Sequence, residues 1–141
     1  MIALQDLKGR SEKEILKHLC ETYSGDGIGN GCPDKSDIKK AKEKLAGKKV
    51  LIAYESVGSW GCDSSSFFLL KDSKTKDLFE VHGSHCSCFG FEGQLKLEPT
   101  SISSLKYRVK NGGNVFYCGG YDGHATENQK AVKNFILKLK T

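Results

Sequence analysis

The sequence predicts a single α+β domain, residues 1–141, in which an antiparallel sheet of about four strands is combined with an N-terminal helical pair and a C-terminal helix. Two observations predict this class. Apolar residues recur at helical spacing near both ends of the chain, whereas short segments in the middle alternate in polarity or are wholly apolar. A length of 141 residues with 38% hydrophobic and 28% charged side chains also fits one folded domain. Residues 1–48 form at most a helical subdomain.

Two helices are predicted in the first third of the chain. Ser11 and Glu14 have the spacing of a capping box, and apolar residues at helical spacing follow over 12–23. A glycine-rich loop over 24–33 separates this helix from a second one, which we expect to start at Ser36. The second helix carries mostly lysine on its polar side, which marks that side as exposed to solvent.

The middle of the chain predicts three strands joined as a meander. Segments 49–56 and 64–71 are apolar on both faces, as is typical of central strands that are covered on both sides. A polar hairpin connection leads to segment 78–82, whose apolar residues alternate with Glu80 and His82. The following segment, 83–94, is expected to be irregular.

The last part of the chain predicts a short helix, a strand and a terminal helix. The short helix starts at Ser101, and the strand covers 114–118. A glycine-rich loop then leads to Thr126 and Gln129, which have the spacing of a second capping box before an apolar helical stripe.

The charge distribution narrows the classes of partner. The chain has 22 basic and 17 acidic side chains, a net charge of +5, and its excess lies in the lysine-rich helical segments at the two ends. Nucleic-acid-binding proteins concentrate arginine and lysine on one face, so nucleic acid is not a favoured partner. No apolar run approaches the roughly 18 residues of a membrane span. Because the first residues also lack the basic and apolar regions of a signal peptide, we expect a cytoplasmic protein.

Cysteine and histidine residues gather between positions 82 and 88. Four such ligands suffice for a closed zinc site, and the candidate set is His85, Cys86 and Cys88 with Cys62 or Cys118. The Cys-x-Cys spacing is tighter than that of a usual zinc knuckle, and no second paired knuckle is present in the sequence. The alternative is that both thiols pack as small hydrophobic groups in a turn, which is also the interpretation of Cys20 on the first helix. We therefore expect no cofactor, with zinc as the alternative.

A cysteine nucleophile is another use of the same thiols. Cysteine catalysis needs a base such as histidine beside the thiol and a third group that orients the base. The residues that can supply these roles are Cys86 and Cys88 as nucleophiles, His82, His85 and His124 as bases, and Asp63 and Asp122 as orienting carboxylates. An enzyme is less favoured than a binding protein, because this hypothesis depends on contacts across the fold that the sequence does not specify.

Two further groups of residues are candidates for ligand or partner binding. Gly119, Gly120 and Gly123 lie between a predicted strand and the helix capped by Thr126, where backbone N–H groups can bind the phosphate of a small ligand. A plain turn is the alternative for this loop. Large aromatic side chains in glycine-rich loops either fold back on the core or meet a partner. The predicted partner-binding residues, all expected on loops at strand ends, are Trp60, His82, His85 and Tyr121.

The region from Glu80 to Arg108 contains Gly-Ser-His-Cys-Ser-Cys at 83–88, Glu-Gly-Gln at 92–94, Glu-Pro at 98–99 and a Thr/Ser-capped helix at 100–109. This combination resembles a segment of small uncharacterised proteins that are common in bacteriophage genomes. Where that family has tryptophan followed by acidic residues, this chain has Leu95-Lys96. The resemblance covers roughly half of the chain, leaves 1–48 outside, and implies an accessory protein that acts inside an infected bacterium.

These observations lead to one functional expectation and two alternatives. We expect a phage-type intracellular accessory protein that binds and inhibits or sequesters a host or defence component without catalysis. The partner is a host or defence protein, or a small phosphorylated ligand. The alternatives are a zinc-stabilised binding module and a small cysteine-dependent hydrolase.

Overall fold

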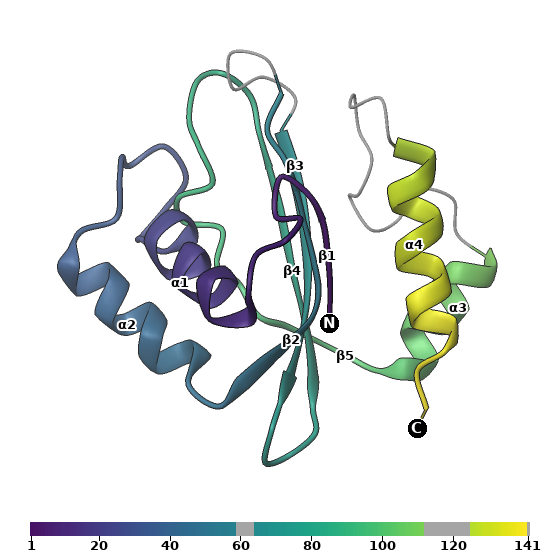
Figure 1. The fold of residues 1–141 in the computed structure, drawn as a ribbon. Helices are drawn as coiled ribbons and strands as arrows, with labels where there is room; N and C mark the ends of the chain where they lie inside the picture. Colours follow the sequence, from purple (N-terminus) through teal and green to yellow (C-terminus); the bar gives the residue numbers. More distant parts are fainter. Residues whose placement is uncertain (59–63, 112–124, 141) are drawn as a thin grey trace.

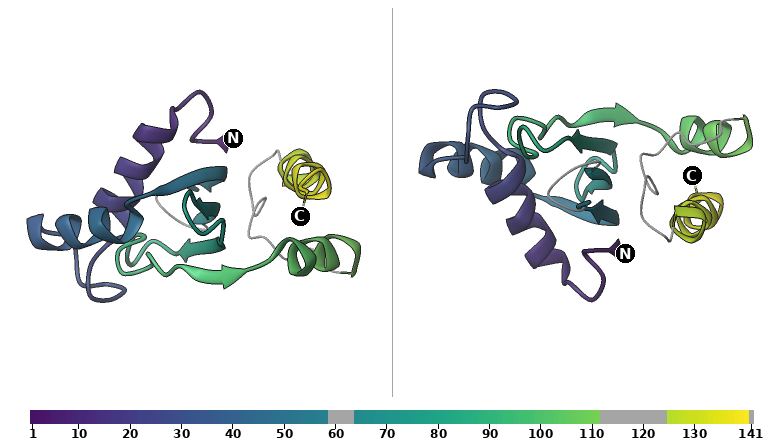
Figure 2. Two further views of the ribbon diagram at one scale, coloured as in Figure 1. Left: turned by 90° about the horizontal axis from the view of Figure 1, so that it is seen from below. Right: turned by 90° about the horizontal axis from the view of Figure 1, so that it is seen from above.

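The protein has an α+β fold of three layers, with one sheet between two pairs of helices (Figure 1). The computed structural model describes residues 1–58, 64–111 and 125–140. Helices α1 and α2 cover one face of the sheet, and α3 and α4 lie on the other, as both views along the strands show (Figure 2). Among the described residues, no helix is long and apolar enough to span a membrane.

Within the described residues the sheet is mixed and has five strands, so the prediction of about four antiparallel strands is wrong in detail. The strands follow one another in the order β1-β2-β3-β4-β5, and all neighbours are antiparallel except β1 and β2. Their bounds are Ile2–Gln5 for β1, Lys48–Ser56 for β2, Ser64–Asp72 for β3, Leu78–His85 for β4 and Glu98–Thr100 for β5. The meander of β2, β3 and β4 is confirmed.

The two strands that the sequence did not predict are both short edge strands. β1 has four residues, and it pairs in parallel with β2 because the chain returns through two helices between them. β5 has three residues, and Pro99 at its centre is tolerated only on an edge strand. Neither segment is long enough to show the alternation of polar and apolar residues by which a strand is predicted. The strand predicted over 114–118 lies outside the described residues.

The four helices begin close to their predicted positions. They are α1 Glu12–Tyr23, α2 Lys35–Leu45, α3 Ile102–Asn111 and α4 Ala125–Leu137. The capping box of Ser11 and Glu14 is confirmed, with both reciprocal bonds present. The start of α2 is one residue earlier than predicted, because Asp34 caps this helix and Asp37 completes a box of its own. Thr126 lies inside α4 rather than at its N-cap position.

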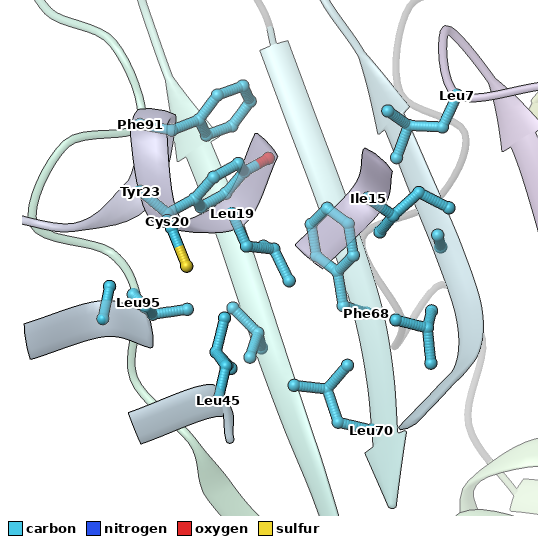
Figure 3. Packing of buried hydrophobic residues seen from close by; sticks show 14 residues of the cluster. Leu7, Ile15, Leu19, Cys20, Tyr23, Leu45, Phe68, Leu70, Phe91 and Leu95 are labelled. Atoms are coloured by element: carbon cyan, nitrogen blue, oxygen red, sulfur yellow. The ribbon is translucent and has the colours of Figure 1, made fainter. Parts of the chain in front are cut away.

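Two apolar clusters, one on each face of the sheet, hold the layers together. Phe68 and Leu70 point from β3 toward α1 and α2, and the alternate residues Phe67 and Leu69 point toward α3 and α4. All four side chains are completely buried. Figure 3 shows the first cluster, in which side chains of α1 and α2 meet those of the sheet. The prediction that the central strands are covered on both sides is confirmed.

A buried charge network fixes α3 to the sheet. Glu80 on β4 is 5% exposed, and its carboxylate accepts a hydrogen bond from Arg108 of α3. His82 Nε2 lies 3.0 Å from Glu80 Oε1. Burial raises the pKa of Glu80, but the bonds from His82, Arg108 and Thr100 outweigh burial and lower it from 4.5 to about 2. The carboxylate therefore stays charged in the interior.

This network gives the protein a specific sensitivity to acid. Because the folded-state pKa of Glu80 lies below its unfolded value, Glu80 stabilises the fold above about pH 5, and this stabilisation is lost as the pH falls toward 2. Glu80→Gln should lower the free energy of unfolding at pH 7 by about 3 kcal/mol, and the difference from the wild type should shrink as the pH falls. Urea unfolding followed by circular dichroism at a series of pH values measures both quantities.

The control is Glu98→Gln, which changes an exposed glutamate on the neighbouring strand. This variant should change the free energy of unfolding by less than about 0.5 kcal/mol at every pH. A difference between wild type and Glu80→Gln that stays constant from pH 7 to pH 2 would show that Glu80 does not titrate in this way.

Candidate functional site

The segment after β4 is bound to the sheet through one side chain. The amide of Gln94 pairs with the backbone of Ser84: Ser84 N–H donates to Gln94 Oε1, and Gln94 Nε2 donates to Ser84 O, both at 2.9 Å. Gln94 Nε2 also lies 3.3 Å from Gly90 O, and the residue is only 8% exposed. Gln94 thus occupies the place that the backbone of a neighbouring strand would take.

Gly83 makes room for an aromatic ring above the sheet. A Cβ atom at Gly83 would lie 2.3 Å from Ser66 Oγ and 2.9 Å from the ring of Phe91. The Phe91 ring stacks on Tyr23 at the end of α1 (Figure 3). The two ring centroids are 4.7 Å apart. Its centroid also lies 4.4 Å from that of His85 in an edge-to-face contact. Phe91 therefore joins the end of β4 to α1.

A second glycine allows two loops to touch through their backbones. Gly93 has φ +77°, and a Cβ atom there would lie 2.4 Å from the carbonyl carbon of Gly27. The N–H of Gly93 donates to Ser24 O at 3.0 Å, and the N–H of Leu95 donates to Tyr23 O at the same distance. The Glu-Gly-Gln stretch at 92–94 is therefore a structural scaffold that holds the 86–97 loop against α1.

The scaffold leaves the two cysteines of the segment on the surface. Cys86 and Cys88 are both exposed, so the prediction that they pack as small hydrophobic groups is wrong. Cys86 directly follows β4 and Cys88 lies in the turn after it, and the N–H of Cys88 donates to Cys86 Sγ at 3.5 Å. His85 Nδ1 lies 2.8 Å from Cys86 O. Cys20, in contrast, is 3% exposed, which confirms its predicted place in the core, and burial raises its pKa.

The two histidines predicted to form one binding surface lie on opposite faces of the sheet. Both belong to β4 rather than to a loop, which corrects the prediction. His82 faces the layer of α3 and α4, where it contacts Glu80, whereas His85 contacts Phe91 on the side of α1. Residues three apart on a strand point in opposite directions, so the structure does not bring His82 to the thiols of Cys86 and Cys88.

The other predicted site residues lie outside the residues that the structure describes. Within 1–58, 64–111 and 125–140, no three His, Cys, Asp or Glu side chains gather closely enough to hold a metal ion. The zinc prediction takes its fourth ligand from Cys62 or Cys118, which both lie beyond these ranges, and it stays a prediction. The predicted residues beyond these ranges are Trp60, Cys62, Asp63, Cys118, Gly119, Gly120, Tyr121, Asp122, Gly123 and His124, and Thr126 is placed through its backbone alone.

A buried glutamate at the end of β2 forms a cluster that sequence reasoning missed. Glu55 is 5% exposed, and His18 Nε2 lies 2.8 and 3.0 Å from its two carboxylate oxygens. The hydroxyl of Tyr23 donates to Glu55 Oε1 at 2.5 Å. Burial, and then the neighbouring carboxylate, raises the pKa of Tyr23 well above its ordinary value, so this hydroxyl remains a donor. The one sequence signal for this cluster is Glu55 itself, a single glutamate near the end of an otherwise apolar strand.

The side chains of this cluster follow one another as in a catalytic triad, but their place in the fold suits a structural role. Thr22 Oγ1 lies 3.3 Å from His18 Nδ1, so hydroxyl, imidazole and carboxylate follow one another as they do in nucleophilic catalysis. The hydroxyl and the imidazole come from the last two turns of α1, where the helix dipole is negative and opposes the charge of an oxyanion. We therefore assign His18, Tyr23 and Glu55 the role of joining the end of α1 to β2.

A groove runs between α1 and α2 on the outer side of the molecule. Its volume is about 410 Å³, and its floor is formed by partly or fully buried apolar side chains of both helices. Lysines stand along both walls. The lining residues are Leu16, Cys20, Ile38 and Leu45 on the floor, and Lys13, Lys17, Glu21 and Lys42 on the walls. The sequence shows both amphipathic helices, but the groove depends on how they pack against each other.

The close backbone approach at Gly93 can be tested against a matched glycine. Gly93→Ala should lower the free energy of unfolding by about 3 kcal/mol, because the methyl group adds a backbone clash to the strain of a positive φ. Gly29 has a similar φ of +84° but open space around it, so Gly29→Ala should cost about 1 kcal/mol. Urea unfolding of both variants gives the comparison, and equal losses would mean that the two loops do not touch.

No protein-family model, no curated protein and no solved structure matches the chain. Its function therefore has to be inferred from the residues described above.

Proposed function

We propose that the protein is a non-catalytic binding module that holds an acidic, amphipathic helical segment of a host or defence protein in the groove between α1 and α2, and so inhibits or sequesters that protein. The single observation that carries the proposal is the combination of an apolar floor with lysine walls in this groove. Helices that bind in grooves place apolar residues at i, i+3, i+4 and i+7 on such a floor.

The length of the groove fits about two turns of a helix. Its lining residues on α1 run from Lys13 to Glu21, a rise of about 12 Å. Leu16 and Ile38 are partly buried and stand on facing helices, so a partner side chain placed between them contacts apolar surface on both sides. Burial of one leucine-sized side chain contributes about 2 kcal/mol.

The charge of the walls favours an acidic partner. Lys13 and Lys17 of α1 and Lys42 of α2 line the groove, whereas Glu21 is the one acidic side chain among its described lining residues. Glu21 Oε1 lies 3.6 Å from Lys17 Nζ, so part of its charge is already balanced. Complementary charge speeds association and selects against basic partners.

The class of partner, a host or defence protein, is taken from the phage resemblance and not from the groove itself. Every lining residue of the groove belongs to 1–48, outside the segment that resembles phage proteins. The phosphorylated ligand, the zinc-stabilised module and the cysteine-dependent hydrolase stay predictions, because they depend on residues at 62–63 and between 112 and 124, beyond the described ranges.

A pair of designed peptides tests this proposal. The first is an 18-residue fluorescent helix with leucine at i, i+3, i+4 and i+7 and glutamate on its polar face, and the second has lysine in place of each glutamate. Fluorescence anisotropy should show the acidic peptide binding at least tenfold more tightly, a difference of about 1.4 kcal/mol, and its affinity should fall as salt is added.

Charge-reversal variants locate the binding surface. Lys17→Glu with Lys42→Glu should weaken binding of the acidic peptide at least tenfold, because both changes reverse charges on the groove walls. The control, Lys49→Glu with Lys74→Glu, makes the same change in net charge at two exposed positions outside α1 and α2 and should alter affinity less than threefold. Equal loss in both double variants, or no binding of the acidic peptide at all, would overturn the proposal.

A further inference from the structure

We propose that Cys86 and Cys88 form a redox-active dithiol that exchanges reversibly with low-molecular-weight disulfides of the glutathione type. The proposal goes beyond the binding function and depends on a different part of the molecule. It is carried by three observations: the spacing of the two cysteines in a turn, a hydrogen bond to sulfur between them, and the rigid frame on both sides of the turn.

The spacing permits a disulfide within the turn. Consecutive Cα atoms lie about 3.8 Å apart, so residues two apart in a bent chain are separated by about 5 to 6 Å, within the range that disulfides span. Cys86 directly precedes the turn and Cys88 lies in it, and both are thiols exposed to solvent. A small-molecule disulfide can therefore reach either sulfur.

The hydrogen bond indicates which sulfur reacts first. The N–H of Cys88 donates to Cys86 Sγ at 3.5 Å, so the sulfur of one cysteine faces the backbone of the other. A backbone N–H directed at sulfur stabilises negative charge on that atom. Cys86 is thus the attacking thiolate, and Cys88 is the thiol placed to resolve the product.

The frame around the turn makes the disulfide easy to reduce. Ser84 is fixed by its two bonds to Gln94, and Phe91 is buried at 3% exposure on the other side of the turn. A disulfide between residues two apart closes a small ring, which the fixed flanks cannot relax by moving. Strained and exposed disulfides are the ones that open readily, so the couple cycles between its two states.

The reaction proceeds in two balanced exchanges. The Cys86 thiolate attacks one sulfur of oxidised glutathione, which forms a mixed disulfide and releases one glutathione thiolate. The Cys88 thiol then loses its proton and attacks Cys86 Sγ, which forms the Cys86–Cys88 disulfide and releases the second glutathione thiolate. Two cysteine thiols are oxidised, one small-molecule disulfide is reduced to two thiols, and the protons from the cysteines pass to the two glutathione thiolates.

The full-length protein in glutathione buffers of graded oxidation tests the couple. Free thiols are alkylated, the chain is digested with trypsin, and the peptide 77–96, which holds both cysteines and no other, is weighed by mass spectrometry. From a reducing buffer this peptide should carry two alkyl groups. As the buffer becomes oxidising it should carry none and weigh two hydrogen atoms less than the unmodified peptide, and dithiothreitol should restore both alkylation sites. Cys88→Ser should instead accumulate one glutathione on Cys86, and at least tenfold faster than on Cys32, an exposed cysteine of the 24–33 loop.

Two controls test whether the oxidation is specific to this peptide and whether the variant is folded. Cys32→Ser should leave the oxidation of peptide 77–96 unchanged, and circular dichroism of Cys88→Ser should match that of the wild type because this side chain is exposed. Two glutathiones on peptide 77–96, or disulfide-linked dimers through it, without any internal disulfide would overturn the proposal. Thiols of this peptide that react only after a chelator is added would also overturn it, in favour of a bound metal.

Discussion

The architecture depends on two central strands that are apolar on both faces. β2 and β3 bury Ala53 and Phe68 on one side and Tyr54 and Phe67 on the other, all at 0% exposure. Neither face can be left in water, so each requires a helical layer, and the sheet becomes the middle of three. The surfaces that remain for recognition are the outer sides of the helices and the ends of the strands, which is where the groove and the cysteine turn lie.

Each face of the sheet also contains one buried carboxylate that is held by the helices covering it. Glu55 is bound by two side chains of α1, and Glu80 is bound by Arg108 of α3. Buried ionic contacts add little net stability, but one that loses its partner is costly. The two clusters therefore select one position of each helical layer on the sheet, because sliding a helix would leave a charge unpaired in the interior.

The sequence predicts what depends on local pattern and misses what depends on contact across the fold. The capping box at Ser11 and the apolar runs of β2 and β3 are readable, because propensity and periodicity carry them. The parallel pairing of β1 joins Ile2 to Ile52, and no local pattern specifies it. The groove, the partners of Glu55 and the pairing of Gln94 with Ser84 likewise require the relative positions of segments far apart or a loop whose path is irregular.

The pairing of Gln94 with Ser84 also bears on how the protein behaves at high concentration. An edge strand with unpaired backbone groups is a template for addition of a strand from another chain, the first step of β-aggregation. β5 pairs with β4 from Leu78 to Glu80 and carries Pro99, which cannot donate, while the Gln94 amide occupies both backbone groups of Ser84 further along the same edge. A side chain thus pairs with β4 at a point of the edge that the short strand does not reach, which shortens the stretch of β4 open to a strand from another molecule.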